Sequence, residues 1–429
     1  MFICTHCDAQ SPKWSGRCLV CDKWGTIQEE DETAKGTSFV VAKSATTAQS
    51  VPLKDRSAQN ELERMQTHDP EMDRVLGGGI VRGSVLLVSG EPGIGKSTLI
   101  AQMTSTITPN KALYISGEES AGQLKARFDR LSCNMDHVHY LEIKPVETLV
   151  ATIEKEKPDL VVIDSIQTVS ASSIDGGPGT PTTVRYATSL FMDLAKRTGV
   201  SIVLIGQVTK DGNVAGPKTL EHLVDVVLSL EGDSAHAYRL LIGKKNRFGS
   251  TDEIGVFEMT QQGMKPIENP SERFLEERAN VPGSVITATV EGSRVFLIEV
   301  QALVEKSVYG MPVRRASGFD QNRLQMLIAI LSKRAGIKLG EQDVYLNVIG
   351  GMKLVEPAND LAVCAAIVSA ATNKPCSSPT VFFGEVGLGG EIRSVPLSEK
   401  RAQEAKRMGM ETIINVKKIK QIGDLKGLF

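Results

Sequence analysis

The sequence contains no run of about 18 apolar residues, the length that a membrane-spanning helix needs. Its first residues, Met1 to Cys7, also lack the basic segment and apolar core of a secretion signal. The formal net charge is only −2, which excludes nucleic-acid binding by bulk charge and leaves that role to a local basic patch. We therefore expect a cytoplasmic protein with no membrane partner.

Aromatic residues are scarce at 5%, whereas hydrophobic residues make up 41% and charged residues 23% of the 429 positions. The last two fractions are ordinary for a chain that buries a full core, and they exclude wholesale disorder. A chain of this length is expected to form about two or three domains.

The seven cysteines are distributed in a way that argues against disulfide bonds. Four of them have the spacing Cys4-x2-Cys7-x10-Cys18-x2-Cys21, which predicts a tetrahedral Zn²⁺ site; a pair of redox motifs would need a βαβ context. Residues 1–28 are too few to bury an adequate core, so zinc is expected to supply the folding free energy. The tryptophans at positions 14 and 24 are predicted to pack in this small core, with a base-stacking platform as the alternative.

Four regions follow one another along the chain. They are the zinc module at 1–28, a polar linker at 29–60, a first α/β domain at 61–265 and a second at 266–429. In the first domain, short Val/Ile/Leu-rich runs alternate with helical patterns, which predicts a doubly wound fold around a buried parallel sheet. In the second, the runs at 285–290 and 295–302 predict a hairpin, after which helices and strands alternate.

One segment of the first domain fits the phosphate-loop pattern G-x4-G-K-[ST] between a predicted strand and a predicted helix. Its glycines let backbone N–H groups close around the phosphates of ATP, while Lys96 reaches the β/γ oxygens and Ser97 holds Mg²⁺. The residues predicted to bind the nucleotide are Gly90, Glu91, Pro92, Gly93, Ile94, Gly95, Lys96, Ser97 and Thr98.

Polar residues end three other predicted strands of this domain. Asp164 is predicted to orient Mg²⁺, and a helix-capping role is its alternative. Glu118 is the predicted general base for hydrolysis, although its neighbour Glu119 is not excluded and is otherwise expected to cap the next helix. Gln207 is placed to sense the γ-phosphate.

Two further segments carry candidate anion contacts. Lys245 and Arg247, in the run K-K-N-R-F-G, follow a strand predicted at 238–242. They are expected to reach the γ-phosphate of a neighbouring subunit or the phosphates of DNA, and a solvated basic turn is the alternative. The Gly/Pro-rich segment from Ser170 to Arg185 resembles, by its place in the chain, the DNA-binding loop of RecA-like proteins. The resemblance implies that Arg185 contacts phosphate there, and a plain surface loop is equally compatible.

The phosphate loop, the strand ending in S-G-E-E and the strands ending in Asp and Gln resemble the RecA/DnaB/KaiC class of motor ATPases. With K-N-R-F-G and the four-cysteine module, the chain resembles the RadA (Sms) family of bacterial DNA repair proteins over essentially its whole length. The resemblance implies a hexameric ring that hydrolyses ATP while moving on single-stranded and branched DNA. It also implies that this motor helps the RecA recombinase to process recombination intermediates.

The second domain resembles the peptidase domain of Lon in the segments V-Y-L-N-V-I-G-G, E-P-A-N-D-L-A-V and F-G-E-V-G-L-G-G-E-I-R. Ala358 stands where that family has its nucleophilic serine, and Lys400 does not align with the catalytic lysine, so no peptidase activity is expected. We interpret the domain as an oligomerisation and DNA-binding scaffold. Its basic residues support this: residues 393–426 hold nine Lys/Arg against four acids, and a second cluster comprises Arg314, Arg315 and Arg323.

Two other functions remain as alternatives to the DNA motor. One is a KaiC-like regulatory ATPase that acts on proteins, and the other, which the missing nucleophile disfavours, is an ATP-dependent protease.

Overall fold

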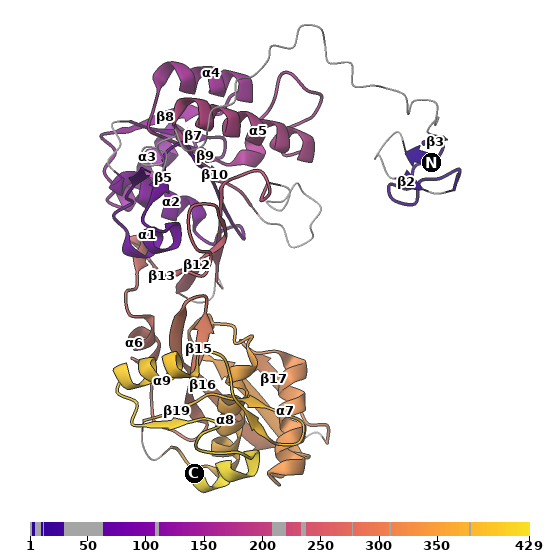
Figure 1. The fold of residues 1–429 in the computed structure, drawn as a ribbon, viewed down its shortest axis with the longest axis vertical. Coiled ribbons are helices and arrows are strands. Elements are labelled where there is room, and N and C mark those ends of the chain that lie inside the picture. The colour runs from indigo at the N-terminus through magenta and orange to yellow at the C-terminus, as the bar shows by residue number, and fades with distance from the viewer. Residues whose placement is uncertain are drawn as a thin grey trace, which may run out of the picture. The chain divides into compact units, whose positions relative to one another are not determined.

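The computed structural model describes residues 2–4, 10–11, 13–29, 63–107, 111–207, 220–232, 237–276, 278–308, 310–376 and 379–429. The chain divides into two compact units, Met1–Ser57 and Ala58–Phe429 (Figure 1). None of the helices in the described part has the length and apolarity that crossing a bilayer demands. Almost all of the predicted linker, and the predicted zinc ligand Cys7, lie outside the described residues.

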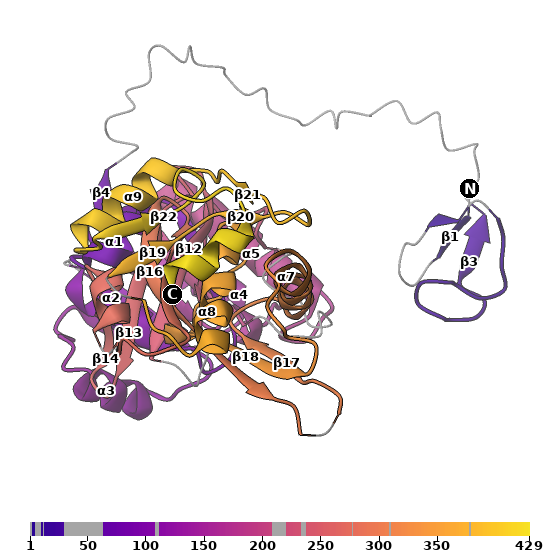
Figure 2. The ribbon, with the colours of Figure 1, turned by 90° about the horizontal axis from the view of Figure 1, so that it is seen from below.

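The first unit contains a three-stranded antiparallel sheet in the order β2-β1-β3 (Figure 2). Its strands are β1 (Phe2–Cys4), β2 (Gln10–Ser11) and β3 (Ile27–Glu29). Cys4, Cys18 and Ile27 form the buried core of this unit. Trp14 and Trp24 are 65% and 75% exposed, so the prediction that they pack in the core is wrong. The cysteine sulfurs occupy the centre, which leaves the large indoles outside.

The second unit begins with a nine-stranded sheet in the order β14-β13-β12-β11-β6-β10-β9-β7-β8. Neighbours from β11 to β8 run parallel, as predicted. The remaining strands, β12, β13 and β14, pair antiparallel, so the sheet is mixed. Each is joined to the strand before it by a short connection, and a short connection between paired strands requires them to run antiparallel. The strands are β6 (Val85–Gly90), β7 (Ala112–Ser116), β8 (Val138–Glu142), β9 (Leu160–Asp164), β10 (Ser201–Ile205), β11 (Val226–Glu231), β12 (Tyr238–Asn246), β13 (Ile254–Thr260) and β14 (Gly263–Pro266).

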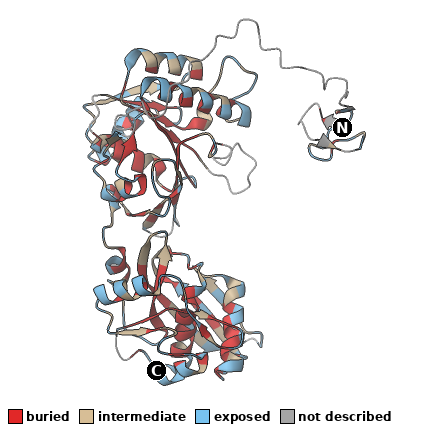
Figure 3. Cartoon of the chain, in the orientation of Figure 1, coloured by how far each residue is buried: buried red, intermediate tan, exposed pale blue. Residues whose placement is uncertain are grey.

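Helices cover both faces of this sheet, which confirms the doubly wound arrangement (Figure 1). Along β6, Leu86 and Val88 pack in the cluster that includes α2 and α3, whereas Val85 and Leu87 pack in the cluster of α4 and α5. The central strands are therefore buried on both sides (Figure 3). The helices are α1 (Pro70–Leu76), α2 (Lys96–Thr106), α3 (Ala121–Arg130), α4 (Val146–Glu156) and α5 (Pro181–Thr198). In addition, β4 (Arg64–Met65) and β5 (Ile80–Val81) form a short antiparallel two-stranded sheet.

The rest of the unit is built on a six-stranded sheet in the order β17-β18-β16-β15-β19-β22. The predicted hairpin is confirmed, because β15 and β16 pair antiparallel throughout. Two apolar clusters lie on opposite faces of the sheet, one with α7 and α8 and the other with α9 (Figure 2). The elements are β15 (Ser284–Glu291), β16 (Arg294–Lys306), β17 (Arg314–Ser317), β18 (Gln342–Val348), β19 (Thr380–Phe382), β20 (Glu385–Val386), β21 (Ile392–Arg393), β22 (Thr412–Ile414), α6 (Pro270–Leu275), α7 (Gln321–Arg334), α8 (Asp360–Thr372) and α9 (Ser398–Arg407).

The turn of the β15–β16 hairpin contacts the first sheet and its helices. The Arg294 guanidinium lies 2.5 Å from the carboxylate of Glu71, a fully buried residue of α1. The backbone N–H of Ser293 donates to the carbonyl of Asp252 at 2.6 Å. The two sheets of this unit are thus joined by a buried ion pair and by backbone pairing.

Candidate active site and metal centre

The phosphate loop spans residues 91–95 between β6 and α2. The φ of Gly95 is +112°, a backbone conformation that residues with a side chain rarely adopt, so glycine is favoured at this position. The Lys96 side chain is buried, and its Nζ donates to the carbonyls of Gly90 and Glu91 at 2.9 Å each. Burial lowers the pKa of Lys96, and the carboxylates of Asp164 and Glu118 oppose that shift.

An arginine that the sequence pattern did not reveal supports this loop. Arg239, on β12, is only 4% exposed, and its Nε donates to the carbonyl of Ile94 at 3.1 Å. The antiparallel extension of the sheet therefore holds the phosphate loop from outside the motif. The sequence did contain a signal for this contact, namely an arginine within an otherwise apolar predicted strand.

Asp164 ends β9 and is 3% exposed. Its Oδ2 accepts a hydrogen bond from the Tyr114 hydroxyl at 2.9 Å. Burial raises the pKa of Asp164, while hydrogen bonds from Ser97 and Tyr114 oppose the rise. The predicted pair of Mg²⁺ ligands, Ser97 and Asp164, is thus brought together, and Tyr114 is a contact that the motifs did not indicate.

Glu118 and Gln207 meet at the same sheet edge. Glu118 Oε1 accepts from the Ser165 hydroxyl at 2.6 Å and from Gln207 Nε2 at 3.1 Å. The candidate base and the candidate γ-phosphate sensor are therefore in direct contact. Ser165 was missed because serine directly after a strand is common and carries no motif of its own.

Glu119 has different surroundings. It forms an ion pair with Arg127 of α3 at 2.5 Å. Ser120, and not Glu119, caps α3, through a capping box with Gln123, so the helix-capping prediction for Glu119 is wrong. Of the two adjacent carboxylates, only Glu118 contacts the other candidate site residues.

Lys245 and Arg247 are held by groups of their own chain. The strand β12 continues to Asn246, beyond the predicted end at position 242. Lys245 Nζ donates to the carbonyls of Glu221 and Val224 at 2.8 Å and of His222 at 3.2 Å. Arg247 lies 3.0 Å from Asp225, and its side chain is 49% exposed. The predicted contact with a neighbouring subunit stays a prediction.

Of the predicted DNA contacts, Arg185 lies on a different element from the one expected. Arg185 is exposed, but it lies on α5 and not in a loop, because Thr180 caps this helix and Pro181 begins it. The Thr-Pro pair was a signal for this helix start. Arg314 lies on β17 with its Nη2 3.4 Å from the carbonyl of Leu339, and Arg315 is exposed on the same strand.

Two cations of the predicted basic clusters in the second domain are neutralised inside it. Arg323 forms a two-pronged ion pair with the buried Asp360. Arg401 is 1% exposed and donates to both carboxylate oxygens of Glu356, at 2.7 and 2.6 Å. Both arginines were wrongly assigned to surface patches, because their partners are distant in sequence. Lysines 400, 406, 417, 418, 420 and 426 remain exposed.

Ala358 is buried at the position of the Lon nucleophile. It lies in the 3-10 turn Pro357–Asn359, is 2% exposed and accepts a backbone hydrogen bond from Gly384 at 2.8 Å. Lys400, on α9, is exposed.

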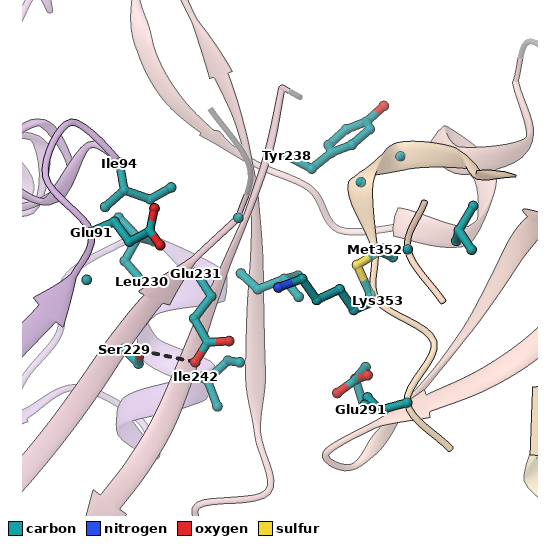
Figure 4. A pocket seen from close by; sticks show the side chains of 18 of the residues that line it. Glu91, Ile94, Ser229, Leu230, Glu231, Tyr238, Ile242, Glu291, Met352 and Lys353 are labelled. Atoms are coloured by element: carbon teal, nitrogen blue, oxygen red, sulfur yellow. Dashed lines mark hydrogen bonds between the residues drawn. The ribbon is translucent and has the colours of Figure 1, made fainter. Parts of the chain in front are cut away.

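A cavity of about 680 Å³ lies beside the phosphate loop (Figure 4). Glu91 and Ile94 line it on one side, and Glu291 of β15 and Lys353 line it on the other. The Lys353 side chain extends toward the side of the cavity on which Glu231 of β11 lies (Figure 4). Burial, together with the carboxylates of Glu356 and Glu231, raises the pKa of Glu291 to about 6. The phosphate loop and the part of this unit that is built on the six-stranded sheet therefore line one cavity.

The sulfur atoms of Cys4, Cys18 and Cys21 all lie within 4.8 Å of one another. Cys4 and Cys21 are 3.6 Å apart, close to the edge of about 3.8 Å that a tetrahedron has when each Zn–S bond is 2.3 Å. The backbone N–H of Val20 points to the Cys18 sulfur at 3.4 Å. These three ligands fit a zinc ion that takes a fourth thiolate.

Comparisons with known proteins agree with this architecture. Family models match as "Rubredoxin metal binding domain" over residues 2–29, "AAA domain" over 50–213 and "Subunit ChlI of Mg-chelatase" over 302–418. The chain is 45% identical over 415 residues to the DNA repair protein RadA of Listeria monocytogenes, covering 96% of this chain and 91% of the relative.

Other relatives are equally similar. The identity is 45% with RadA of Pseudomonas aeruginosa and 46% with RadA of Rickettsia bellii, each covering 96% of this chain and 92% of the relative. Among solved structures, a KaiC-like protein from Pyrococcus horikoshii OT3 matches with 18% identity and a TM-score of 0.40, covering 48% of this chain and 99% of that chain. With an N-terminal zinc ribbon, a phosphate-loop ATPase domain and a ChlI- and Lon-like domain, the chain belongs to the RadA family of DNA repair proteins.

Proposed function

We propose that this protein is a DNA-dependent ATPase that acts as a hexameric ring motor, or helicase, on single-stranded and branched DNA in the cytoplasm. In this role it would process recombination intermediates together with the RecA recombinase. One observation carries the proposal: Lys96, Asp164, Glu118 and Gln207, from four separate segments, converge on one sheet edge. The name of the relatives, DNA repair protein, supports DNA as the polymer on which this chemistry acts.

The phosphate loop binds ATP by exchanging internal contacts for phosphate contacts. Lys96 Nζ leaves the carbonyls of Gly90 and Glu91 and donates to the β/γ oxygens, which are stronger acceptors because they are charged. The N–H groups at the start of α2 face the phosphates. A hydroxyl beside a buried carboxylate fits the oxygen preference of Mg²⁺, so Ser97 and Asp164 would hold this ion, which neutralises charge on the phosphates.

Glu118 is the group that we assign to position and deprotonate the attacking water. The Ser165 hydroxyl and the Gln207 amide fix the orientation of its carboxylate. Because Gln207 contacts Glu118 directly, departure of the γ-phosphate alters the hydrogen bonds of Gln207. Gln207 would thereby sense the presence or loss of the γ-phosphate.

Lys245 and Arg247 are assigned to the γ-phosphate site of the neighbouring subunit in the ring. Arg247 is the more exposed of the two and is held by the single carboxylate of Asp225, whereas Lys245 is held by three carbonyls. An arginine supplied in this way is worth roughly 10³–10⁵ in rate where it has been measured. A subunit on its own would therefore hydrolyse ATP slowly.

The test is ATP turnover by the full chain with and without single-stranded DNA at low salt, together with negative-stain images in the presence of an ATP analogue. We expect stimulation by DNA and ring-shaped particles, and Lys96→Ala should abolish turnover while it leaves the zinc content unchanged. Turnover that DNA does not stimulate would favour the KaiC-like regulatory ATPase.

A peptidase function is not part of the proposal. Ala358 offers no nucleophile, so we expect no cleavage of casein with or without ATP. Cleavage that co-purifies with the wild-type chain and disappears in Lys96→Ala would revive the protease alternative.

A further inference from the structure

The zinc module presents two exposed indoles that the metal site does not use. Trp14 is 65% and Trp24 is 75% exposed, and they are the two tryptophans of the whole sequence. Both lie against Gly16: a Cβ placed on this residue would be 3.6 Å from a ring carbon of Trp24 and 3.9 Å from one of Trp14. Both indole rings therefore lie close to the backbone of Gly16.

Backbone pairing fixes the two tryptophan segments beside each other. Arg17 and Trp24 form an antiparallel bridge, and Gly25 N–H donates to the carbonyl of Gly16 at 2.9 Å. The turn between them carries Cys18 and Cys21, two of the zinc ligands. The turn that carries two of the predicted zinc ligands thus holds the two indoles side by side, and the large apolar area that remains in water calls for a partner.

The charge around the indoles is positive. A lysine precedes each tryptophan, and Arg17 lies between them, so residues 13–26 hold three cations against one acid, Asp22. Lys13, Arg17 and Lys23 are all exposed, and Arg17 forms an exposed pair with Asp22 at 3.1 Å. This local excess contrasts with the net charge of −2 of the whole chain.

A ligand that matches these features has flat apolar groups spaced along a chain of negative charges, which describes single-stranded nucleic acid. Its bases stack on aromatic rings, whereas a duplex hides the faces of its bases inside the stack. An apolar protein segment would match the indoles but would have no use for the cations beside each of them.

We propose that Trp14 and Trp24 form a stacking site for bases of single-stranded DNA, with Lys13, Arg17 and Lys23 at its phosphates. This inference rests on the proposed function, because it names a second place where the DNA of that function is held. It assigns the zinc ribbon a direct role in binding DNA, beyond the binding of metal.

The test uses intrinsic fluorescence of the full chain, since both emitters lie in the site. Titration with oligo(dT) at low salt should quench the tryptophan emission saturably, and a duplex of equal length should quench it much less. Trp14→Ala and Trp24→Ala should each weaken the quenching titration, by roughly 5- to 150-fold in affinity. Leu19→Ser, which changes an 85% exposed apolar side chain of the same module outside the indole pair, should leave the titration unchanged.

Each variant is first checked for one bound zinc per chain, so that a misfolded module is recognised and excluded. Binding of labelled oligo(dT), followed by anisotropy, without any change in tryptophan emission would overturn the inference while the proposed function stands. Absence of both oligo(dT) binding and DNA-stimulated turnover would overturn both. An emission change produced by RecA protein and not by oligo(dT) would also overturn the inference, in favour of a protein-docking surface.

Discussion

At the scale of single residues, two adjacent carboxylates are expected to behave differently because their surroundings differ. Glu118 accepts hydrogen bonds from Ser165 and Gln207, whereas Glu119 is bound by Arg127. Glu118→Gln should reduce ATP turnover by about 10²–10⁴, the range typical of a general base, and should leave nucleotide binding intact. Single-turnover hydrolysis and fluorescent-nucleotide binding measure the two effects.

The matched control is Glu119→Gln, which breaks the ion pair with Arg127 but leaves the Glu118 contacts in place. We expect turnover to stay within a few-fold of the wild type. Equal loss of turnover in both variants would contradict the assignment of the base.

A second residue-scale prediction concerns Glu291, which lines the cavity beside the phosphate loop. The pKa of this carboxyl rises from its ordinary 4.5 to about 6 in the folded protein. The folded state therefore binds the proton more tightly, so protonated Glu291 favours folding, and this benefit is lost as the pH rises from 4.5 through 6. Above that window the carboxylate destabilises the fold, by about 1 kcal/mol once its partial exposure is considered.

Glu291→Gln should accordingly raise the free energy of unfolding at pH 7.5, and the gain should shrink as the pH falls to 5. Urea denaturation at both pH values measures this difference. Glu411→Gln, at an exposed position, is the control and should have no effect at either pH. An equal increase in the free energy of unfolding at both pH values would contradict the ionisation of Glu291 as its cause.

At the scale of secondary-structure elements, the β15–β16 hairpin turn is expected to be a major point of stabilisation. Its Arg294 is the partner of Glu71, which is 0% exposed and also lies 3.3 Å from Arg74. Arg294→Met leaves a buried carboxylate with only the more distant cation, so it should lower the free energy of unfolding by about 3–5 kcal/mol. Chemical denaturation of the full chain measures the loss.

Two comparisons test the reason for that loss. Arg273→Met removes an exposed cation of α6 that pairs with Glu258 at 3.0 Å, and it should cost under about 1 kcal/mol. The double variant Glu71→Met/Arg294→Met should be more stable than Arg294→Met, since no unpaired charge stays buried. A double variant that is less stable than the single one would point to lost packing as the cause.

Elements with strong local signals could be predicted, and those that depend on distant partners could not. The apolar runs at β6, β9 and β10 indicated a parallel sheet, and Asp164, Glu118 and Gln207 were recognised as polar residues that end its strands. Because the carboxyl ends of parallel strands share one edge, these side chains lie at the same edge of the sheet. The antiparallel strands β13 and β14 have weaker patterns and were not recognised. Arg401 illustrates the other limit: its exposure depends on Glu356, 45 residues away, which no local pattern reveals.

At the scale of the whole molecule, some cations form ion pairs within their own unit and others are exposed at the surface. Several arginines that increase the apparent basic charge of the sequence are bound to carboxylates of their own unit, as Arg323 is to Asp360. The lysines of the last segment and the cations of the zinc module are exposed instead, at positions that a polyanion can reach. The net charge of −2 for the whole chain does not reveal either of these two local groups of exposed cations.

The two units should also respond differently to loss of metal. The first unit has a core of Cys4, Cys18 and Ile27, so its fold depends on the zinc that joins the cysteines, whereas the second unit holds three large apolar clusters and a fourth smaller one. A zinc-selective chelator, added with excess Mg²⁺, should release about one zinc per chain and change the tryptophan emission. Turnover of ATP without DNA should stay within about twofold of that of the untreated protein, because every assigned nucleotide contact lies in the second unit.

Cys18→Ser should reproduce both the emission change and the unchanged turnover without chelator. Loss of DNA-independent turnover in either experiment would show that the ATPase unit needs the folded zinc module.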